Sequence, residues 1–475
     1  MLNIFNSFTQ KHEILKLNTD KIIKMYVCGV TSYDFCHIGH GRTFIFFDIV
    51  LRYLRYCGYK LQYVRNITDI DDKIIAKSIE NNETIFSLSN RMIDQMNKDF
   101  LNLNIVSPDY EPRATENIDI IIQFILQLLN SKHAYVSNCG DVMFSIDTYL
   151  NYGLLSNQLI DNLKIGVRIS KNLNKRNPSD FVLWKLLKKH ETFCWNSPWG
   201  KGRPGWHIEC SSMSSSILKD RIDIHGGGKD LLFPHHENEL AQSTCINKKF
   251  FVNHWMHTEL VIVKNKKMSK SLGNALLLKD LLVRYDSESI RFFLLSTHYR
   301  HPLYFYEENL KKSEILLKKL YFSLRNIDFT MFNSLNLTNY CSYSLFKLDF
   351  CKALNNDFNT PVALSILLKM SHRINILKLK CSDRNDNNEI IVLAYRLREL
   401  GNILGILFQD PEYFFQKIDK FSSDEISNIN LLIQKRDNAR KIKNWIKADK
   451  IRNNLLNLGI VLEDSKYNTF WRKLK

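Results

Sequence analysis

Four side chains of the types that bind zinc lie at the end of an expected strand or on expected helices. Cys28 ends an apolar run, Cys210 lies in an expected helix, and His235 and Glu239 are four residues apart on another helix. That spacing places the last two on one helical face, and the carboxyl ends of parallel strands meet at one edge of a sheet. The four donors therefore form a candidate zinc site. Neighbouring donors leave alternatives open: His207, His225, His236 and Glu237.

The stretch around Cys28 also predicts a ligand site. The apolar run at residues 25–28 has the character of a buried strand, and Gly39 allows a ligand to approach the start of the next helix. Residues 44–54 carry apolar side chains on one helical face, and residues 61–64 predict the next strand. A strand, a crossover helix and a second strand make a βαβ unit, whose ligand site lies at the turn after the first strand.

Two short motifs are separated by enough residues for a complete nucleotide-binding domain, and they occur in the expected order. They read His37-Ile38-Gly39-His40 and Lys267-Met268-Ser269-Lys270-Ser271. A basic surface turn is the alternative for the second motif, and a tetrapeptide alone occurs by accident in roughly one chain of this length in a few hundred. The pair together resembles the two signature motifs of the class I aminoacyl-tRNA synthetases.

Size and composition indicate an enzyme of several domains. The 475 residues are 45% hydrophobic, without an apolar run long enough for a bilayer or the layout of a signal peptide, so a cytoplasmic enzyme is expected. Ten cysteines without a Cys-x-x-Cys pair speak against a zinc ribbon and a disulfide framework. The formal charge of +17 suits RNA as a partner, although heavy use of Lys, Asn and Ile offers compositional bias as an alternative.

The order of expected elements predicts an α/β fold: a Rossmann-like parallel-sheet catalytic domain with an insertion, then an α-helical bundle and a small mixed α/β C-terminal domain. Helices are expected in succession from residue 279 onward. A single long basic helix is expected from about residue 424 to a stop at Gly459, followed by two short strands. The predicted boundaries are 1–114 and 203–260 for the two halves of the catalytic domain, 115–202 for the insertion, 261–315 for a junction domain, 316–415 for the bundle and 416–475 for the C-terminal domain.

Longer runs make the resemblance specific. From residue 25 to residue 304 the sequence is similar to cysteinyl-tRNA synthetases, through runs at 65–73, 202–210, 223–228 and 233–239. The resemblance implies a cysteine–tRNA ligase that uses ATP with Mg2+, L-cysteine and tRNA(Cys), and that is a monomer. It implies these residues: Cys28, Cys210, His235 and Glu239 as ligands of one zinc ion; His37, Gly39, His40 and Lys270 at ATP; Gly29, Thr68, Trp206 and His225 at cysteine; and His37, His40, Lys267 and Lys270 in catalysis.

The need to distinguish cysteine from serine explains why the implied site contains zinc. A synthetase for cysteine must reject serine, and a hydrophobic pocket separates such near-isosteres poorly. A thiol can ionise and bind zinc as a thiolate, whereas a hydroxyl is harder and far less acidic. Discrimination of about 10^4 needs roughly 5.5 kcal/mol, which a metal bond can supply without an editing site. Because four protein ligands ordinarily close a zinc site, this hypothesis requires a fifth coordination position when cysteine binds.

The C-terminal end carries the remaining part of the resemblance. Eight Lys or Arg residues lie between residues 435 and 452, together with Trp445, in a region similar to the anticodon-binding domain of the family. Two departures from the family pattern leave turn geometry and RNA contacts open, at Asn468 and at residues 168–171. The alternatives are a ligase that joins cysteine to an amino sugar, another class I synthetase such as the methionine enzyme, and a catalytically silent RNA-binding relative.

Overall fold

The computed structural model describes most of the chain, in two compact units. The described residues are 2–15, 22–158, 175–188, 193–219, 221–247, 251–263, 266–267, 275–329, 332, 341–380, 384–418, 422–464 and 469–473. The first unit comprises Met1–Leu310 with Phe350–Ala363, and the second comprises Lys311–Asp349 with Leu364–Lys475. The finer division into five domains stays a prediction.

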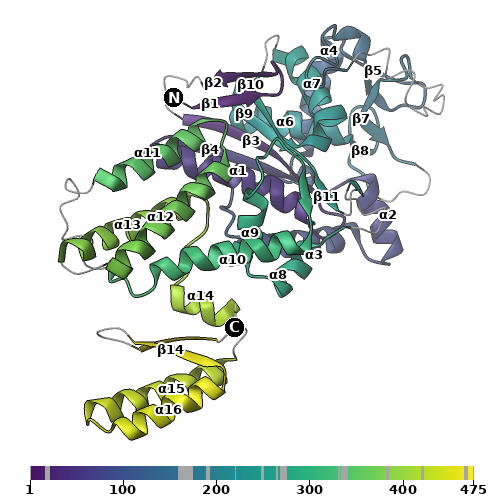
Figure 1. The fold of residues 1–475 in the computed structure, drawn as a ribbon. Coiled ribbons are helices and arrows are strands. Elements are labelled where there is room, and N and C mark those ends of the chain that lie inside the picture. Colours follow the sequence, from purple (N-terminus) through teal and green to yellow (C-terminus); the bar gives the residue numbers. More distant parts are fainter. Residues whose placement is uncertain are drawn as a thin grey trace. The chain divides into compact units, whose positions relative to one another are not determined.

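A four-stranded parallel sheet in the order β10-β9-β3-β4 lies at the centre of the first unit (Figure 1). Its strands are β3 (Ile22–Thr31), β4 (Lys60–Thr68), β9 (Ile222–Gly228) and β10 (Val252–Thr258). Three of them confirm predicted strands, but β10 was not predicted. Its sequence mixes polar and apolar residues without clear alternation, so pairing with β9 at the sheet edge decides its conformation.

Two helices cover opposite faces of this sheet, α1 (Ile38–Tyr56) and α6 (Trp206–Leu218). Tyr26 and Cys28 of β3 belong to one apolar cluster with Cys210 of α6. The side chain between them faces the other way, because side chains alternate along a strand. On that second face, a Cβ on Gly226 would lie 2.0 Å from the Phe47 ring of α1. A glycine is therefore required there for α1 to pack directly on the strand backbone.

The predicted insertion contains an antiparallel sheet of its own, in the order β5-β6-β7-β8. Its strands are β5 (Ala134–Val136), β6 (Val142–Phe144), β7 (Phe181–Leu186) and β8 (Gly202–Pro204). The first two confirm the predicted strand pair around residues 138–141, and α4 (Ile118–Asn130) contributes its apolar face to the same core. Most of the polar stretch predicted at 155–177 lies outside the described residues.

The remaining elements of the first unit frame this central sheet. They are β1 (Asn3–Asn6), β2 (Lys11–Ile14), α2 (Asp72–Glu80), α3 (Ile85–Asn102), α7 (Glu237–Asn247), β11 (Val261–Val263), β12 (Lys266–Lys267), α8 (Leu278–Arg284), α9 (Ser287–Leu295) and β13 (Leu303–Phe305). The helix expected to open at Pro234 begins as a regular α-helix only at Glu237. Phe233 has an extended backbone (φ −139°, ψ 132°), because the residue before a proline disfavours the helical region.

Helices follow one another from α10 onward, as predicted, although α14 was not predicted. They are α10 (Glu307–Leu324), α11 (Cys341–Asn355), α12 (Thr360–Lys380), α13 (Arg384–Ile403), α14 (Pro411–Ile418), α15 (Ser423–Lys441) and α16 (Trp445–Asn457), and the strands β14 (Ile460–Asp464) and β15 (Thr469–Lys473) end the chain. None of the described helices combines the length and the apolar character that crossing a membrane requires.

The single long basic helix predicted before Gly459 is wrong: α15 and α16 are separate helices. Lys443 has a left-handed backbone (φ 56°), which ends the first helix, and the Asn444 side chain accepts a hydrogen bond from the Lys447 N–H at the start of the second. The two helices and both strands share a small apolar core that includes Leu455 and Trp471. The predicted strands at 460–462 and 469–472 are confirmed.

Candidate active site

The four predicted zinc donors lie together at the carboxyl edge of the parallel sheet. The Sγ atoms of Cys28 and Cys210 are 3.8 Å apart, and Cys28 Sγ lies 3.2 Å from Glu239 Oε1. His235 Nε2 lies 2.9 Å from the same carboxylate oxygen. One donor atom from each residue lies within 4.8 Å of all the others, and all four residues are buried. Strand β3, helix α6, the turn at Leu232–His236 and the start of α7 therefore bring together side chains that are up to 211 residues apart.

These separations fit a tetrahedral zinc ion. Two sulfur atoms each about 2.3 Å from such an ion would be about 3.8 Å apart, which is the separation found between Cys28 and Cys210. The cluster is also composed only of groups that bind metal well when deprotonated. Thiolate, imidazole and carboxylate together form a donor set typical of zinc and not of magnesium or calcium.

The pKa values of these groups depend on burial and on one another. Burial raises the pKa of the Cys28 thiol, and the nearby Cys210 and Glu239 raise it further. Burial opposes a charge on His235, but Glu239 and Cys210 outweigh burial and raise the pKa of His235 to about 10. Cys28 and His235 therefore bind protons readily, and a cation would compete with these protons for the same donor atoms.

A second group of donors overlaps the first, comprising Cys28, His225, His236 and Glu239. His236 Nε2 lies 3.3 Å from Cys28 Sγ, and His236 Nδ1 lies 2.7 Å from His257 Nε2. The alternatives His225 and His236 are therefore real neighbours of the cluster, whereas Glu237 instead accepts hydrogen bonds from backbone N–H groups of the insertion. His257 could not be found from the sequence, because it lies on β10, the strand that was not predicted.

His207 contacts the His235 ring at the nitrogen that does not face Glu239. Its Nδ1 lies 2.9 Å from Nδ1 of His235, so His207 orients the ring whose Nε2 faces Glu239. Trp206 packs on the same His235 ring with centroids 4.4 Å apart. Both residues are at the first turn of α6, one turn before Cys210.

His37 and His40 cap helix α1 reciprocally. Nδ1 of each ring accepts a hydrogen bond from the backbone N–H of the other residue, at 3.3 and 3.2 Å, and the rings stack with centroids 3.8 Å apart. Because Nδ1 is the acceptor in both neutral rings, the hydrogen resides on Nε2 in both. The motif therefore presents two imidazole N–H donors on rings that the helix start holds rigidly.

A cavity of about 230 Å3 opens beside this capped helix start. Six predicted residues line it: Cys28, Gly29, His37, Gly39, His40 and Trp206. Thr68 and His225 are buried next to the lining; Thr68 pairs with Thr31, which lines the cavity, and His225 Nε2 lies 3.6 Å from Cys28 Sγ. The candidate nucleotide, cysteine and zinc groups thus converge on one site.

The residues that follow the second motif are attached next to the first motif. The Ile38 N–H donates to the Leu276 carbonyl, and the Leu278 N–H donates to the Cys36 carbonyl, both at 2.8 Å. Val261, at the start of β11 before the second motif, lines the cavity. Of Lys267 only the backbone is described, in β12, and Lys270 lies outside the described residues, as do Asn468 and residues 168–171.

Arg42 fixes the residue directly before β11 to helix α1. Its guanidinium donates to the backbone carbonyls of Leu260, at 3.0 Å, and of His298 and His301. Burial lowers the pKa of Arg42 to about 10, against the opposing effect of Glu259. Even so, this guanidinium is charged at neutral pH, and its hydrogen bonds hold the two motif-bearing segments in register.

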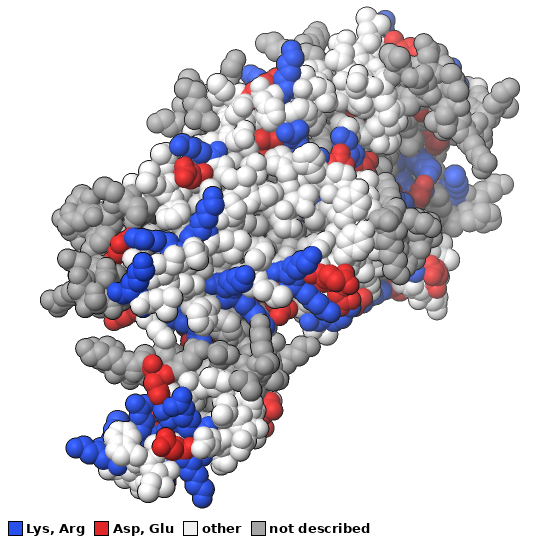
Figure 2. Space-filling model, viewed as in Figure 1, with Lys and Arg blue, Asp and Glu red and all other residues white. Residues whose placement is uncertain are grey.

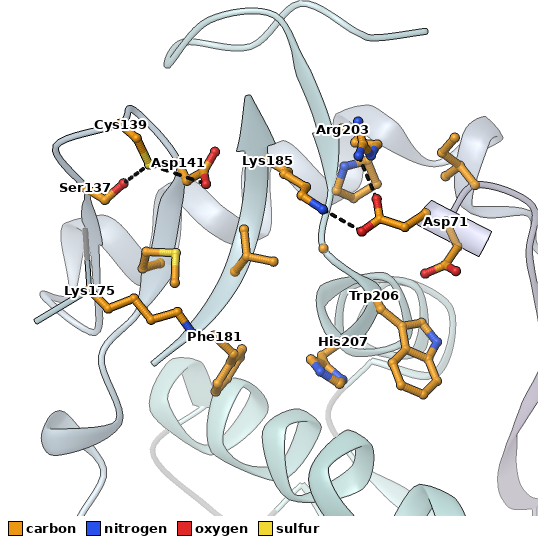
Figure 3. Close-up of a pocket in the computed structure, with 16 residues that line it drawn as sticks. Asp71, Ser137, Cys139, Asp141, Lys175, Phe181, Lys185, Arg203, Trp206 and His207 are labelled. Atoms are coloured by element: carbon orange, nitrogen blue, oxygen red, sulfur yellow. Dashed lines mark hydrogen bonds and ion pairs between the residues drawn. The ribbon is translucent and has the colours of Figure 1, made fainter. Parts of the chain in front are cut away.

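A second cavity of about 390 Å3 lies between the insertion sheet and the start of α6 (Figure 3). Trp206 borders both cavities. Two of the basic side chains in this second cavity converge on one carboxylate, since Lys185 Nζ and Arg203 lie 2.5 and 2.6 Å from Asp72. These cations are already paired, so the second cavity lacks the excess positive charge of an anion site.

Positive charge gathers on the C-terminal helices. Figure 2 shows Lys and Arg side chains on the displayed face of this region, with Asp and Glu among them. Some are paired, because Arg436 makes a two-pronged contact to Asp464 at 2.8 and 2.7 Å. Trp445, at the start of α16, is 55% exposed and therefore available to a planar ligand such as a base.

Comparisons with known proteins agree with this architecture. Residues 14–315 match the family model described as tRNA synthetases class I (C) catalytic domain, residues 349–409 match the DALR domain, and residues 424–472 match the cysteinyl-tRNA ligase anticodon binding domain. A solved structure of Mycobacterium tuberculosis methionyl-tRNA synthetase, in complex with methionyl-adenylate, aligns with a TM-score of 0.60 at 14% identity. It covers 82% of this chain and 91% of that chain, which shows the shared fold.

Relatives with much higher identity extend over the full length. The cysteine–tRNA ligase of Buchnera aphidicola subsp. Baizongia pistaciae is 61% identical, and that of Baumannia cicadellinicola subsp. Homalodisca coagulata is 50% identical. Each alignment covers 100% of this chain and 100% of the relative. Together with the match of the catalytic family model over residues 14–315, this similarity shows that the chain belongs to the cysteinyl-tRNA synthetase family of class I aminoacyl-tRNA synthetases.

Proposed function

We propose that the chain acts as a cysteine–tRNA ligase whose amino-acid selection depends on a zinc ion held by Cys28, Cys210, His235 and Glu239. It activates L-cysteine with ATP and Mg2+ to the adenylate, releases pyrophosphate, and transfers the cysteinyl group to tRNA(Cys). The observation that carries this proposal is the buried convergence of the four donors next to the cavity lined by His37 and His40.

The activation step needs positioning and charge stabilisation and no nucleophile from the protein. The cysteine carboxylate attacks the α-phosphorus of ATP, and negative charge grows on the phosphate oxygens. The Nε2–H groups of His37 and His40 are the donors proposed for these oxygens, and Gly39 leaves room for the nucleotide. Lys267 and Lys270 are proposed for the same charge, with Lys270 at pyrophosphate. The attachment of residues 276–278, which follow the second motif, to residues 36–38 supports this assignment.

The cysteine pocket is proposed to consist of Gly29, Thr68, Trp206 and His225 around the metal cluster. When bound, zinc supplies a Lewis acid that prefers the substrate thiolate to a serine hydroxyl. His207 and Trp206 keep the His235 ring in place, and Trp206 also walls the cavity. Selectivity for cysteine over serine therefore depends on residues that hold the metal rather than on pocket shape.

Transfer of the cysteinyl group requires binding of tRNA. The match of residues 424–472 to an anticodon-binding domain supports tRNA(Cys) as the acceptor and argues against an amino-sugar acceptor. Exposed Trp445 and the basic residues of α15 and α16 are the proposed contacts, through stacking and phosphate pairing. Both motifs and the donor cluster are intact, which argues against a catalytically silent relative.

The test is exchange of pyrophosphate into ATP, measured with each of the twenty amino acids on protein assayed for zinc. We expect exchange with cysteine alone. In Cys210→Ala, zinc content and cysteine-dependent exchange are expected to fall together. Cys245→Ala is the matched control, since Cys245 is a buried cysteine on α7 outside the donor cluster.

Two results would contradict parts of this proposal. Exchange with a different amino acid would overturn cysteine as the substrate. Unchanged selectivity against serine in zinc-free Cys210→Ala would overturn recognition through the metal and leave only the class I activation chemistry.

A further inference from the structure

A buried carboxylate next to the proposed cysteine pocket has one oxygen without a protein partner. Glu209, on α6 directly before Cys210, has 0% exposure. Its Oε2 accepts a hydrogen bond from the Thr68 hydroxyl at 3.0 Å, whereas its Oε1 has no hydrogen-bond partner among the described residues. Buried polar atoms in native proteins are nearly always satisfied, so an unsatisfied oxygen beside a ligand pocket points to a group supplied by the ligand.

The hydrogen bonds around Thr68 determine what its hydroxyl can offer to a ligand. A threonine hydroxyl has one hydrogen and two lone pairs. The hydrogen is given to Glu209, and the Asn66 side-chain nitrogen approaches the same hydroxyl oxygen at 3.5 Å. The orientation of the Asn66 amide is fixed in turn, because its oxygen accepts the Gly29 N–H at 2.9 Å. Toward a ligand, Thr68 Oγ1 is therefore left as an acceptor only.

We propose that Glu209 is a positioning residue that makes the pocket selective for the α-ammonium group of its substrate. By taking the hydrogen of Thr68, Glu209 turns that hydroxyl into an acceptor for an ammonium N–H, and its unpartnered Oε1 is a second acceptor. An ammonium group is a donor with a full positive charge, so it matches both features. The pocket is thereby built for α-amino thiols, and thiols without the amino group are disfavoured.

This inference rests on the proposed function, since it takes Thr68 as a contact to cysteine. It adds a determinant that is separate from the metal. The four zinc donors recognise the thiol, whereas Glu209 and Thr68 recognise the opposite end of the same small molecule. Selection at both ends explains why α6 carries Glu209 and Cys210 side by side, one directed to Thr68 of β4 and the other to Cys28 of β3.

The test compares two ligands on the zinc-loaded full chain. Calorimetric titration gives the affinities of cysteine and of 3-mercaptopropionate, which keeps the thiol and the carboxylate but lacks the amino group. In Glu209→Gln we expect cysteine affinity to fall at least about tenfold, with 3-mercaptopropionate affinity and zinc content unchanged. Asp99→Asn is the matched control, because Asp99 is also a buried carboxylate with one unpartnered oxygen, but its other oxygen accepts from the Gln95 side chain and not from Thr68.

A second pair of variants keeps the inference testable even if Glu209→Gln does not fold. Thr68→Val removes the acceptor and is expected to lose the same preference for cysteine, whereas Thr68→Ser retains it. Equal weakening of both ligands, no weakening of either, or loss of zinc from Glu209→Gln would overturn the positioning role. If the wild-type chain binds cysteine no better than serine, the proposed function itself fails, and the inference fails with it.

Discussion

At the scale of single residues, Gly29 shows how closely the site is tied to the packing of its strands. A Cβ at this position would lie 1.6 Å from the backbone carbonyl oxygen of Asn66 on β4. Strand β3 has an irregularity between Val27 and Val30, and the Gly29 N–H donates to the Asn66 side chain there. The backbone that lines the cysteine pocket is therefore fixed by a contact that only glycine permits.

Gly29→Ala should destabilise the first unit strongly. The added methyl meets backbone rather than a flexible side chain, so we expect a loss of about 3 kcal/mol or more in the free energy of unfolding. Gly58→Ala is the comparison, because Gly58 has φ 87° but no atom within 4 Å of its added Cβ. It should cost only about 1 kcal/mol, from backbone strain. Urea unfolding of the full chain measures both, and equal costs would contradict the argument.

At the scale of elements, the start of α1 combines a structural and a chemical role. The same two imidazoles cap the helix and present their Nε2–H groups next to the cavity. Capping explains why both side chains hold a defined orientation without a ligand. The chemistry proposed for the motif depends on the ring, whereas the cap depends only on a side-chain acceptor.

His37→Asn should therefore separate the two roles. Asparagine is a good N-cap residue, so we expect the free energy of unfolding to change by less than about 1 kcal/mol. Cysteine-dependent pyrophosphate exchange should fall about 100- to 1000-fold, because one donor to the transition state is lost. Exchange and thermal unfolding are measured on the same preparation. A large loss of stability with little loss of exchange would show that the motif acts mainly as a cap.

The pair of strands at the C-terminus depends on one acidic side chain. The Asp464 carboxylate accepts both prongs of Arg436 and the Thr469 hydroxyl. The hydrogen bond from Arg436, together with the one from Thr469, outweighs partial burial and lowers the pKa of Asp464 to about 2. The contact therefore links α15 to β14 and β15 only while this carboxylate is ionised.

The sign of the resulting pH dependence follows from the lowered pKa. In the unfolded chain an aspartate has a pKa of about 3.9, so the contribution of Asp464 is complete above that pH and is lost as the pH falls toward 2. The protection of the β14–β15 amides against hydrogen exchange, relative to their intrinsic exchange rates, should fall over this window. Asp464→Asn should lose protection already at neutral pH and show little further change on acidification. Matching pH profiles for both proteins would refute this linkage.

At the scale of the whole molecule, the charge of +17 predicts that the affinity for tRNA depends strongly on salt. Contacts between Lys or Arg and phosphates release counterions, so affinity falls steeply with salt. Binding of labelled tRNA(Cys) should weaken by about 1000-fold or more between about 50 and 200 mM salt. The KM for cysteine in pyrophosphate exchange should change little over the same range. A nearly flat salt dependence of tRNA binding would favour the compositional explanation of the charge.

The sequence by itself determined the family, the main strands and helices of the sheet and the four residues of the candidate metal cluster. These features depend on local patterns and on long specific runs of sequence, such as the residues around Cys210 and His235. Both can be recognised without knowledge of the fold. Local patterns also explain two of the errors, since neither the turn at Lys443 nor strand β10 has a strong local signal. The conformation of β10 is decided by its neighbour β9.

Only the tertiary structure decided which side chains act together. His257 and His207 contact His236 and His235 across distant segments, and Glu209 meets Thr68 from 141 residues away. The orphaned oxygen of Glu209 and the shared capping of His37 and His40 are likewise facts of distance and burial. A hydrogen bond depends on a separation of about 3 Å in space, and sequence spacing fixes such a separation only within one helix or strand.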